Sequence, residues 1–156
     1  MIKGLRVDHR LLHGQVAVSW FNATGADTIL IANDDVANNE SRKTIMRIAK
    51  PTNAKLVMKD LDYCINAINT GLTEKYDMFV VVENISDAYK LIKGTEVFNS
   101  LNLGGTKPTK DTKNISKTIN LTEEENNLLN ELVESGIEVE IRQVPADQKK
   151  YFKNIR

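Results

Sequence analysis

The sequence predicts an α/β fold with a mainly parallel open sheet, and three observations lead to this prediction. Short β-branched runs alternate with helical patterns at least five times, which is typical of parallel strands joined by right-handed helical crossovers. The run MFVVVE at 78–83 is continuously apolar, as a central strand covered on both faces should be. The length of 156 residues, without an internal repeat or linker, predicts a single domain over 1–156.

Seven segments have the composition of strands. The last of them, IEVEIRQV at 137–144, alternates apolar and polar residues, which favours a half-exposed or edge strand. The seven predicted strands are IKGLRV (2–7), DTILIA (27–32), AKLVM (54–58), MFVVVE (78–83), FNSLNL (98–103), KTINL (117–121) and IEVEIRQV (137–144). They predict a sheet of about seven strands.

Helical patterns fill the intervals between these strands. The clearest begins at Thr122, which forms a capping box with Glu125, and it stops at Gly136. Its apolar face consists of Leu128, Leu129, Leu132 and Val133. The other predicted helices are 15–24, a helix capped by Asn38 or Asn39 that runs to Ala49, 61–69, and 85–93 followed by Gly94.

Composition limits the classes of function. Lysine plus arginine and aspartate plus glutamate both number 21, and this balance argues against a general nucleic-acid binder. The single cysteine, Cys64, excludes an intrachain disulfide, fits a reducing compartment, and lies in an apolar helical pattern typical of a core residue. The first residues lack the apolar core of a signal peptide, and no run reaches the ~18 apolar residues of a membrane span. We therefore expect a cytoplasmic protein.

The stretch VDHRLLHGQV at 7–16 holds both histidines of the chain, between the first predicted strand and the first predicted helix. Ligands of open α/β sheets gather beyond the carboxyl ends of strands, which is where this stretch lies. A helix starting near Gly14 offers free N–H groups to an anion, and Arg10 adds a planar donor fork suited to phosphoryl oxygens. The stretch therefore predicts an anion site.

His13, at the mouth of that helix, is the candidate nucleophile. An imidazole with an ordinary pKa near 6.5 is largely neutral at pH 7, so it can carry a phosphoryl group as well as hold an anion. Three alternatives stay open at this point: a hydrogen-bonded structural histidine, a metal pair with His9 at i,i+4 spacing, and a dinucleotide site. The metal pair lacks a third soft ligand, and no G-x-G-x-x-G follows the first strand.

The segment DHRLLHGQ at 8–15 closely resembles the D-x-R-L-x-H-G-Q signature of IIB components of the mannose–fructose–sorbose family of the bacterial phosphoenolpyruvate-dependent sugar phosphotransferase system (PTS). The resemblance extends over essentially the whole chain. It also includes IANDDVANNESRK (31–43), NLGG (102–105) and GIEVEIRQVP (136–145).

This resemblance implies a mainly parallel sheet flanked by helices on both faces, with an antiparallel edge. It also implies a protein-Nπ-phosphohistidine–sugar phosphotransferase that needs no cofactor or metal. Such a protein accepts a phosphoryl group from the phosphohistidine of a IIA partner. It then passes the group to the sugar substrate at the membrane components IIC and IID, so that membrane association is peripheral and through partners.

The match also implies roles for single residues. His13 corresponds to the histidine phosphorylated at Nδ1, and Arg10 to the arginine associated with the phosphoryl group. Asp8 corresponds to the leading acid, which we expect to hold Arg10 or the loop, while Gly14 and Gln15 correspond to the helix start that lines the site. Position 9 is often acidic in the family, so His9 departs from the pattern. We expect it to be a solvent-facing or loop-packing imidazole.

Several other residues are weaker candidates. Asp34 and Asp35 follow the second strand, where helix capping is the expected role. Gly104 and Gly105 begin the lysine-containing segment 104–114, which is either a solvated excursion or a flap beside the anion site. The remaining candidates form a basic helix face that we expect to be solvated or to help dock IIA; they are Arg42, Lys43 and Arg47.

Two further functions stay open. A regulatory module would use the same pocket to sense a phosphorylated ligand or IIA without passing phosphate to sugar, and a metal-dependent hydrolase would hold a metal ion. The sequence does not identify the sugar, and it permits a homodimer without requiring one.

Overall fold

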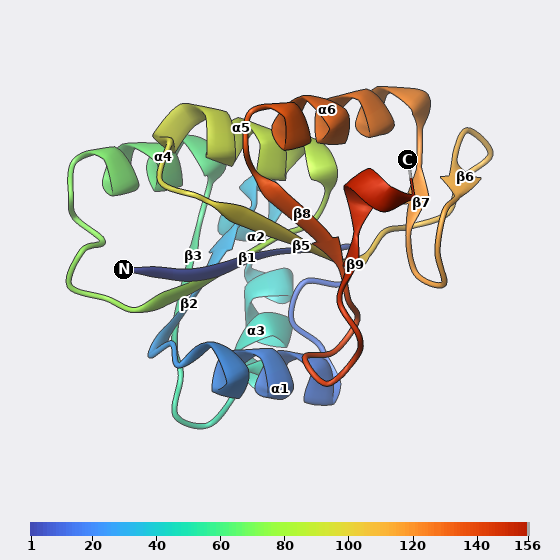
Figure 1. The fold of residues 1–156 in the computed structure, drawn as a ribbon. Coiled ribbons are helices and arrows are strands. Elements are labelled where there is room, and N and C mark those ends of the chain that lie inside the picture. The colour runs from blue at the N-terminus through green and yellow to red at the C-terminus, as the bar shows by residue number, and fades with distance from the viewer. Residues whose placement is uncertain (156) are drawn as a thin grey trace.

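The computed structural model describes residues 1–155 and shows a seven-stranded sheet between two layers of helices (Figure 1). The strand order is β3-β2-β4-β1-β5-β8-β9. All neighbouring strands pair in parallel except β8 and β9, which pair antiparallel at one edge. The predicted fold class is therefore confirmed. Within residues 1–155, no helix combines the length and the apolar character needed to cross a membrane.

The elements follow one another along the chain as strand–helix units. The strands of the large sheet are β1 (Ile2–Asp8), β2 (Thr28–Ala32), β3 (Lys55–Lys59), β4 (Met78–Val82), β5 (Ser100–Gly105), β8 (Glu138–Ile141) and β9 (Lys150–Tyr151). The helices are α1 (Gly14–Thr24), α2 (Asp34–Ala37), α3 (Glu40–Ala49), α4 (Leu61–Asn69), α5 (Ile85–Thr95), α6 (Glu123–Glu134) and the 3-10 turn η1 (Phe152–Asn154). Strands β6 (Lys113–Asn114) and β7 (Asn120–Leu121) form a separate hairpin.

Two predicted helix caps are confirmed by their hydrogen bonds. Thr122 and Glu125 form the reciprocal capping box of α6, and the Asn39 side chain accepts the N–H of Arg42 at the start of α3. Gly136 after α6 has a φ of 95°, a left-handed conformation that residues with a side chain rarely adopt.

The two layers of helices create two apolar cores. Helices α4, α5 and α6 cover one face of the sheet, and α1 and α3 cover the other (Figure 1). The first core contains side chains of α4, α5 and α6, while the second joins Trp20 and Phe21 of α1 to Met46 of α3. Strand β4 is buried along its whole length, which confirms that MFVVVE is a central strand.

Two expectations about single strands were wrong. KTINL (117–121) does not join the large sheet, because only Asn120 and Leu121 are extended and they pair with β6. The seventh strand is β9, whose two exposed residues are too short a run to predict a strand. IEVEIRQV is neither an edge strand nor half-exposed within β8, since β8 lies between β5 and β9 and three of its four residues are buried. Its alternation includes the buried Glu140, which forms an ion pair with Arg142.

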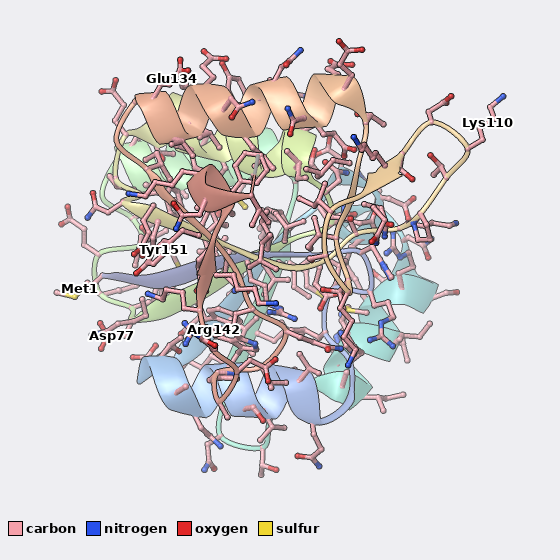
Figure 2. All side chains as sticks on the ribbon, turned by 45° about the vertical axis from the view of Figure 1, so that its right-hand side comes forward. Met1, Asp77, Lys110, Glu134, Arg142 and Tyr151 are labelled. Atoms are coloured by element: carbon pink, nitrogen blue, oxygen red, sulfur yellow. The ribbon has the colours of Figure 1, made fainter. Side chains whose placement is uncertain are left out.

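Strand β1 lies inside the sheet and directs alternate side chains to opposite faces. Leu5 and Val7 enter the core beneath α4–α6. Arg6 lies against Trp20 on the α1 side, where Asp8, two residues on, also points. Parallel strands bring β1 and its neighbours β4 and β5 to a common carboxyl edge. The β6–β7 hairpin lies on this side of the molecule, and the loop that leads into β6 projects from it with Lys110 at its tip (Figure 2).

Candidate active site

The turn between β1 and α1 is held in one shape by two buried leucines. Leu11 has a φ of 56°, and its side chain and that of Leu12 are each 3% exposed in the core beneath α1 and α3. The left-handed conformation costs a non-glycine residue about 1 kcal/mol or more, which the buried packing offsets. Gly14 has a φ of 49° at the start of α1. These positions aim the intervening His13 back toward the end of β1.

His13 makes a direct contact with Asp8. The Nε2 atom of His13 lies 2.9 Å from Oδ2 of Asp8, whose side chain is 4% exposed, while 19% of the His13 side chain is exposed. A carboxylate accepts hydrogen bonds, so Nε2 carries the proton and donates it. The second ring nitrogen, Nδ1, therefore holds the lone pair of the neutral imidazole.

The Asp8 carboxylate has three donors. Oδ1 accepts the backbone N–H of Arg10 at 3.0 Å, and Oδ2 also accepts from the guanidinium of Arg6 at 3.1 Å. Burial raises the pKa of this carboxyl, but the hydrogen bonds from His13 and Arg10 and the charge of Arg6 outweigh burial and set the pKa of Asp8 below its ordinary value. Asp8 is therefore an anion that binds both the loop and the His13 ring.

A cavity of about 330 Å³ lies beside this contact. Of the sequence-predicted site residues, Asp8, Arg10 and His13 line it, whereas Gly14 and Gln15 are not among its lining residues in the described chain. The cavity is lined by Arg6, Asp8, His9, Arg10, His13, Gly104, Gly105, Thr106, Pro108, Lys117, Thr118, Asn120 and Gln143. The first part of the 104–114 segment thus adjoins the site, and Lys110 at its tip points away (Figure 2).

Helix α1 differs from the other helices at its N-terminus. Its N-cap residue is His13, which makes no side-chain capping hydrogen bond. Each of the helices α2 to α6 is capped by a side chain, from Asn33, Asn39, Asp60, Asn84 and Thr122 respectively. Uncapped N–H groups and the helix dipole favour an anion. The backbone N–H groups of Gly14 and Gln15, in the first turn of α1, therefore have no side-chain cap that would compete with an anion.

Sequence reasoning missed Arg6 and Asn102 beneath the site and Lys117, Thr118 and Gln143 in its wall. Arg6 and Asn102 lie inside runs that read as ordinary strands, and both are buried. A signal was present, since a charged residue within an apolar strand is almost never buried without a partner. The wall residues reach the cavity because of the path that the chain takes after β5 and β8. Local sequence patterns do not predict that path.

The remaining candidates lie outside the cavity. Asp34 is not the cap of α2, which is Asn33; its carboxylate accepts the N–H of Leu61 at 2.9 Å, while Asp35 forms an ion pair with Arg42. The basic face of α3 is also internally neutralised: Arg42 contacts Glu83 at 2.6 Å, and Lys43 and Arg47 lie within 4 Å of Glu40.

Cys64 is buried, whereas His9 is half-buried and lines the cavity. Cys64 is 1% exposed, and burial raises the pKa of its thiol to about 12, as befits a core residue. Both ring nitrogens of His9 are buried without a hydrogen-bond partner, so its polar atoms do not face solvent. Within residues 1–155, no group of three or more His, Cys, Asp or Glu side chains is arranged to hold a metal ion.

The comparisons with known proteins agree with this geometry. The family model described as "PTS system sorbose subfamily IIB component" matches residues 2–155. The fructose-specific EIIB component of Bacillus subtilis is 29% identical over 150 residues, which cover 96% of this chain and 92% of that protein. The mannose-specific EIIAB component of Escherichia coli is 29% identical over 96% of this chain and 46% of its own length.

A solved structure gives the same answer for the fold. The crystal structure of the IIBSor domain of the sorbose permease from Klebsiella pneumoniae has a TM-score of 0.93 and 27% identity to this chain, with 99% of this chain and 94% of that one covered. IIB components are phosphotransferases of sugar uptake that work with IIA and the membrane partners IIC and IID. The chain belongs to the sorbose subfamily of PTS IIB components.

Proposed function

We propose that His13 is the phosphocarrier of this IIB component: its Nδ1 accepts a phosphoryl group from phospho-IIA and passes the group to the sugar at the IIC and IID components. The observation that carries this proposal is the 2.9 Å contact between Nε2 of His13 and Asp8. This contact fixes the tautomer whose lone pair lies on Nδ1, in a ring that lines a cavity together with Arg10.

The transfer conserves atoms and charge. The Nδ1 lone pair forms a bond to phosphorus while the phosphorus–nitrogen bond of phospho-IIA breaks and its electron pair returns to the IIA imidazole. The phosphorylated His13 ring keeps its Nε2 proton and so carries a positive charge, which the Asp8 carboxylate stabilises. A sugar hydroxyl then attacks phosphorus, the Nδ1 lone pair is restored, and the hydroxyl proton passes to solvent or a partner base.

Positioning and charge supply most of the catalysis that phosphoryl transfer needs. Arg10 is an exposed cation of the cavity wall, and its planar fork suits the equatorial oxygens of the transferring group. Lys117 adds a second cation to the wall. The uncapped N-terminus of α1 contributes neutral N–H donors and no full positive charge. These donors bind the phosphoryl group weakly enough for it to leave as readily as it arrives.

The partners follow from the same scheme. A separate or fused IIA would dock over the turn at 9–15, on the cytoplasmic side, in a transient interface. The E. coli relative carries an EIIAB name and is about twice the length of this chain's match, which supports a IIA domain as the donor. Fructose, mannose and sorbose all occur in the names of relatives, so the names leave the sugar open.

A phosphorylation assay with two variants tests the proposal. With phosphorylated IIA as donor, His13→Ala folds but accepts no phosphate, and Arg10→Ala accepts it at a rate about 10²-fold lower because one stabilising donor is missing. Acceptor activity that survives in His13→Ala contradicts the assignment.

The second half of the cycle needs its own measurement. Membrane vesicles containing IIC and IID, added with sugar, should discharge the labelled protein and yield sugar phosphate. Label that stays on the protein in the presence of every sugar its own IIC and IID transport would indicate a sensor that does not transfer.

A further inference from the structure

Arg6 is the most deeply enclosed cation near the site. Its side chain is 3% exposed and lies within β1, two residues before Asp8. One guanidinium nitrogen donates to Oδ1 of Asn102 at 2.6 Å and to the carbonyl of Arg142 at 3.2 Å, and the other donates to Oδ2 of Asp8 at 3.1 Å. The plane also lies 5.2 Å from the centre of the Trp20 ring.

These contacts fix the direction of the guanidinium as well as its place. Asn102 is itself held, because its side-chain N–H donates to the same Arg142 carbonyl at 3.1 Å. Trp20 is anchored by a hydrogen bond from Nε1 to the carbonyl of Gln143 at 2.9 Å. The planar fork therefore spans from Asn102 to Asp8 with no freedom to turn, which a flexible ammonium group would not achieve.

The backbone is also shaped around this side chain. A Cβ atom on Gly104 would lie 2.1 Å from Cζ of Arg6, so only glycine leaves room for the guanidinium at this point of β5. The adjacent Gly105 has no such constraint, since its Cβ would meet Asp8 Oδ1 at 3.9 Å. Of the two glycines, only Gly104 must lack a side chain to leave room for Arg6.

Burial of a cation is costly and calls for an explanation beyond packing. Burial lowers the pKa of Arg6, and the Asp8 carboxylate opposes that change. A hydrophobic side chain at this position would often give equal or greater stability than a buried ion pair. The pair does one thing that a hydrophobic residue cannot do, which is to hold Oδ2 of Asp8 as an anion in line with the ring of His13.

We propose that Arg6 is a positioning residue of phosphoryl transfer, which holds the Asp8 carboxylate charged and aimed at Nε2 of His13 and so keeps Nδ1 as the nucleophile. The inference rests on the proposed function of His13. Arg6 also lines the cavity, but its two terminal nitrogens already donate to Asp8, Asn102 and the carbonyl of Arg142, so we assign its effect to the hold on Asp8.

The charged groups around the ring define what loss of Arg6 should do. Asp8 contacts the ring from β1, and the cavity beside the ring is also lined by His9 and Arg10 of the turn and by Lys117. Glu140 and Arg142 form a separate ion pair. Removing Arg6 removes a cation next to the Asp8–His13 pair. The ring then protonates at higher pH than in the parent protein, and Asp8 loses the contact that fixes its orientation.

The test uses Arg6→Met, Arg6→Lys and the control Arg142→Met. Arg142 is also stacked on Trp20, at 5.0 Å, and is also paired with a buried carboxylate, but its guanidinium does not contact Asp8. Nitrogen-15 NMR of the His13 ring across pH reports the tautomer and the protonation midpoint without any phosphoryl donor. Single-turnover transfer from phospho-IIA is then measured across the same pH range, with thermal melting for each protein.

We expect Arg6→Met to lose the dominance of the Nε2–H tautomer, to move the acid limb of the pH–rate profile upward, and to slow transfer about 10²-fold. Arg6→Lys should recover part of the tautomer preference and of the rate. Arg142→Met should melt earlier yet keep the parental tautomer and midpoint.

The proposal is overturned if Arg6→Met keeps the parental tautomer and pH profile and only melts earlier. If Arg6→Met does not fold, the tautomer and the pH profile of Arg6→Lys decide the question instead. Arg6→Lys keeps the positive charge but lacks the planar guanidinium that holds Asp8. Because the ring spectrum needs no donor, its result stands apart from the proposed function. If the parent protein accepts no phosphate on His13, the proposed function is refuted. The NMR result would still show whether Arg6 controls the tautomer of His13.

Discussion

The substitution Gly104→Ala tests the architecture beneath His13 with a single methyl group. The new Cβ would lie 2.1, 2.2 and 2.4 Å from Cζ and the two terminal nitrogens of Arg6, whereas non-bonded carbon contacts are normally ~3.5–4.0 Å. The guanidinium must therefore move by about 1 Å or more. Such a shift breaks the 2.6 Å hydrogen bond to Asn102 and the 3.1 Å contact with Asp8.

The expected cost follows from the burial of these groups. Breaking a buried ion pair typically costs about 3–5 kcal/mol, and each kcal/mol lowers the melting temperature of a domain of this size by ~2–4 °C. We therefore expect Gly104→Ala to lower the melting temperature by about 6–20 °C in a circular dichroism melt at neutral pH. Transfer from phospho-IIA should slow as well, because Asp8 loses a partner.

Gly105→Ala is the matched control for this measurement. The added Cβ would meet Oδ1 of Asp8 at 3.9 Å, an ordinary van der Waals distance. Its effect on the melting temperature should stay within ~2 °C. Equal melting temperatures for the two variants would refute the reasoning, because they would show that the space at Gly104 is not reserved for Arg6.

Three further predictions concern single side chains. Asp8→Asn should favour the Nδ1–H tautomer of His13 and slow phosphorylation by about 10²–10⁴-fold in a single-turnover assay, since loss of an orienting carboxylate has effects of this order; an unchanged rate would show that Asp8 does not orient the ring. The Cys64 thiol, with a pKa of about 12, should react with an alkylating reagent at pH 8 only as fast as the protein unfolds, and rapid labelling of the folded protein would contradict its burial. Thr122→Ala should remove the cap of α6 and cost about 1 kcal/mol in urea unfolding, whereas no loss would show that the capping box does not stabilise the fold.

The sequence predicted the elements whose signals are local. The caps at Asn39 and Thr122 and the apolar run of β4 lie at their predicted positions, because side-chain caps and continuous apolarity depend on neighbouring residues. Strand β9 was missed because two exposed residues pair with β8 only through the path of the chain. The segment KTINL was wrongly predicted to be a strand of the large sheet. Its composition is strand-like, but its last two residues pair with β6 in a short separate hairpin.

The site shows the same division. Asp8 and His13 were identified as candidates from one short motif, but their direct contact depends on the turn conformations of Leu11 and Gly14. Arg6 was read as part of an ordinary strand, although a buried cation there needs an anion on the same face two residues away. Asn102 is 96 residues distant along the chain, so only the pairing of β1 with β5 brings it to Arg6.

The phosphorus-31 NMR spectrum of the protein after reaction with phosphorylated IIA shows which atom, if any, carries the phosphoryl group. We expect one new resonance, that of an Nδ1-phosphohistidine, which is absent from the spectrum of His13→Ala treated in the same way. A resonance of an Nε2-phosphohistidine would contradict the tautomer fixed by Asp8. Phosphate that still appears on His13→Ala would contradict the assignment of the nucleophile itself.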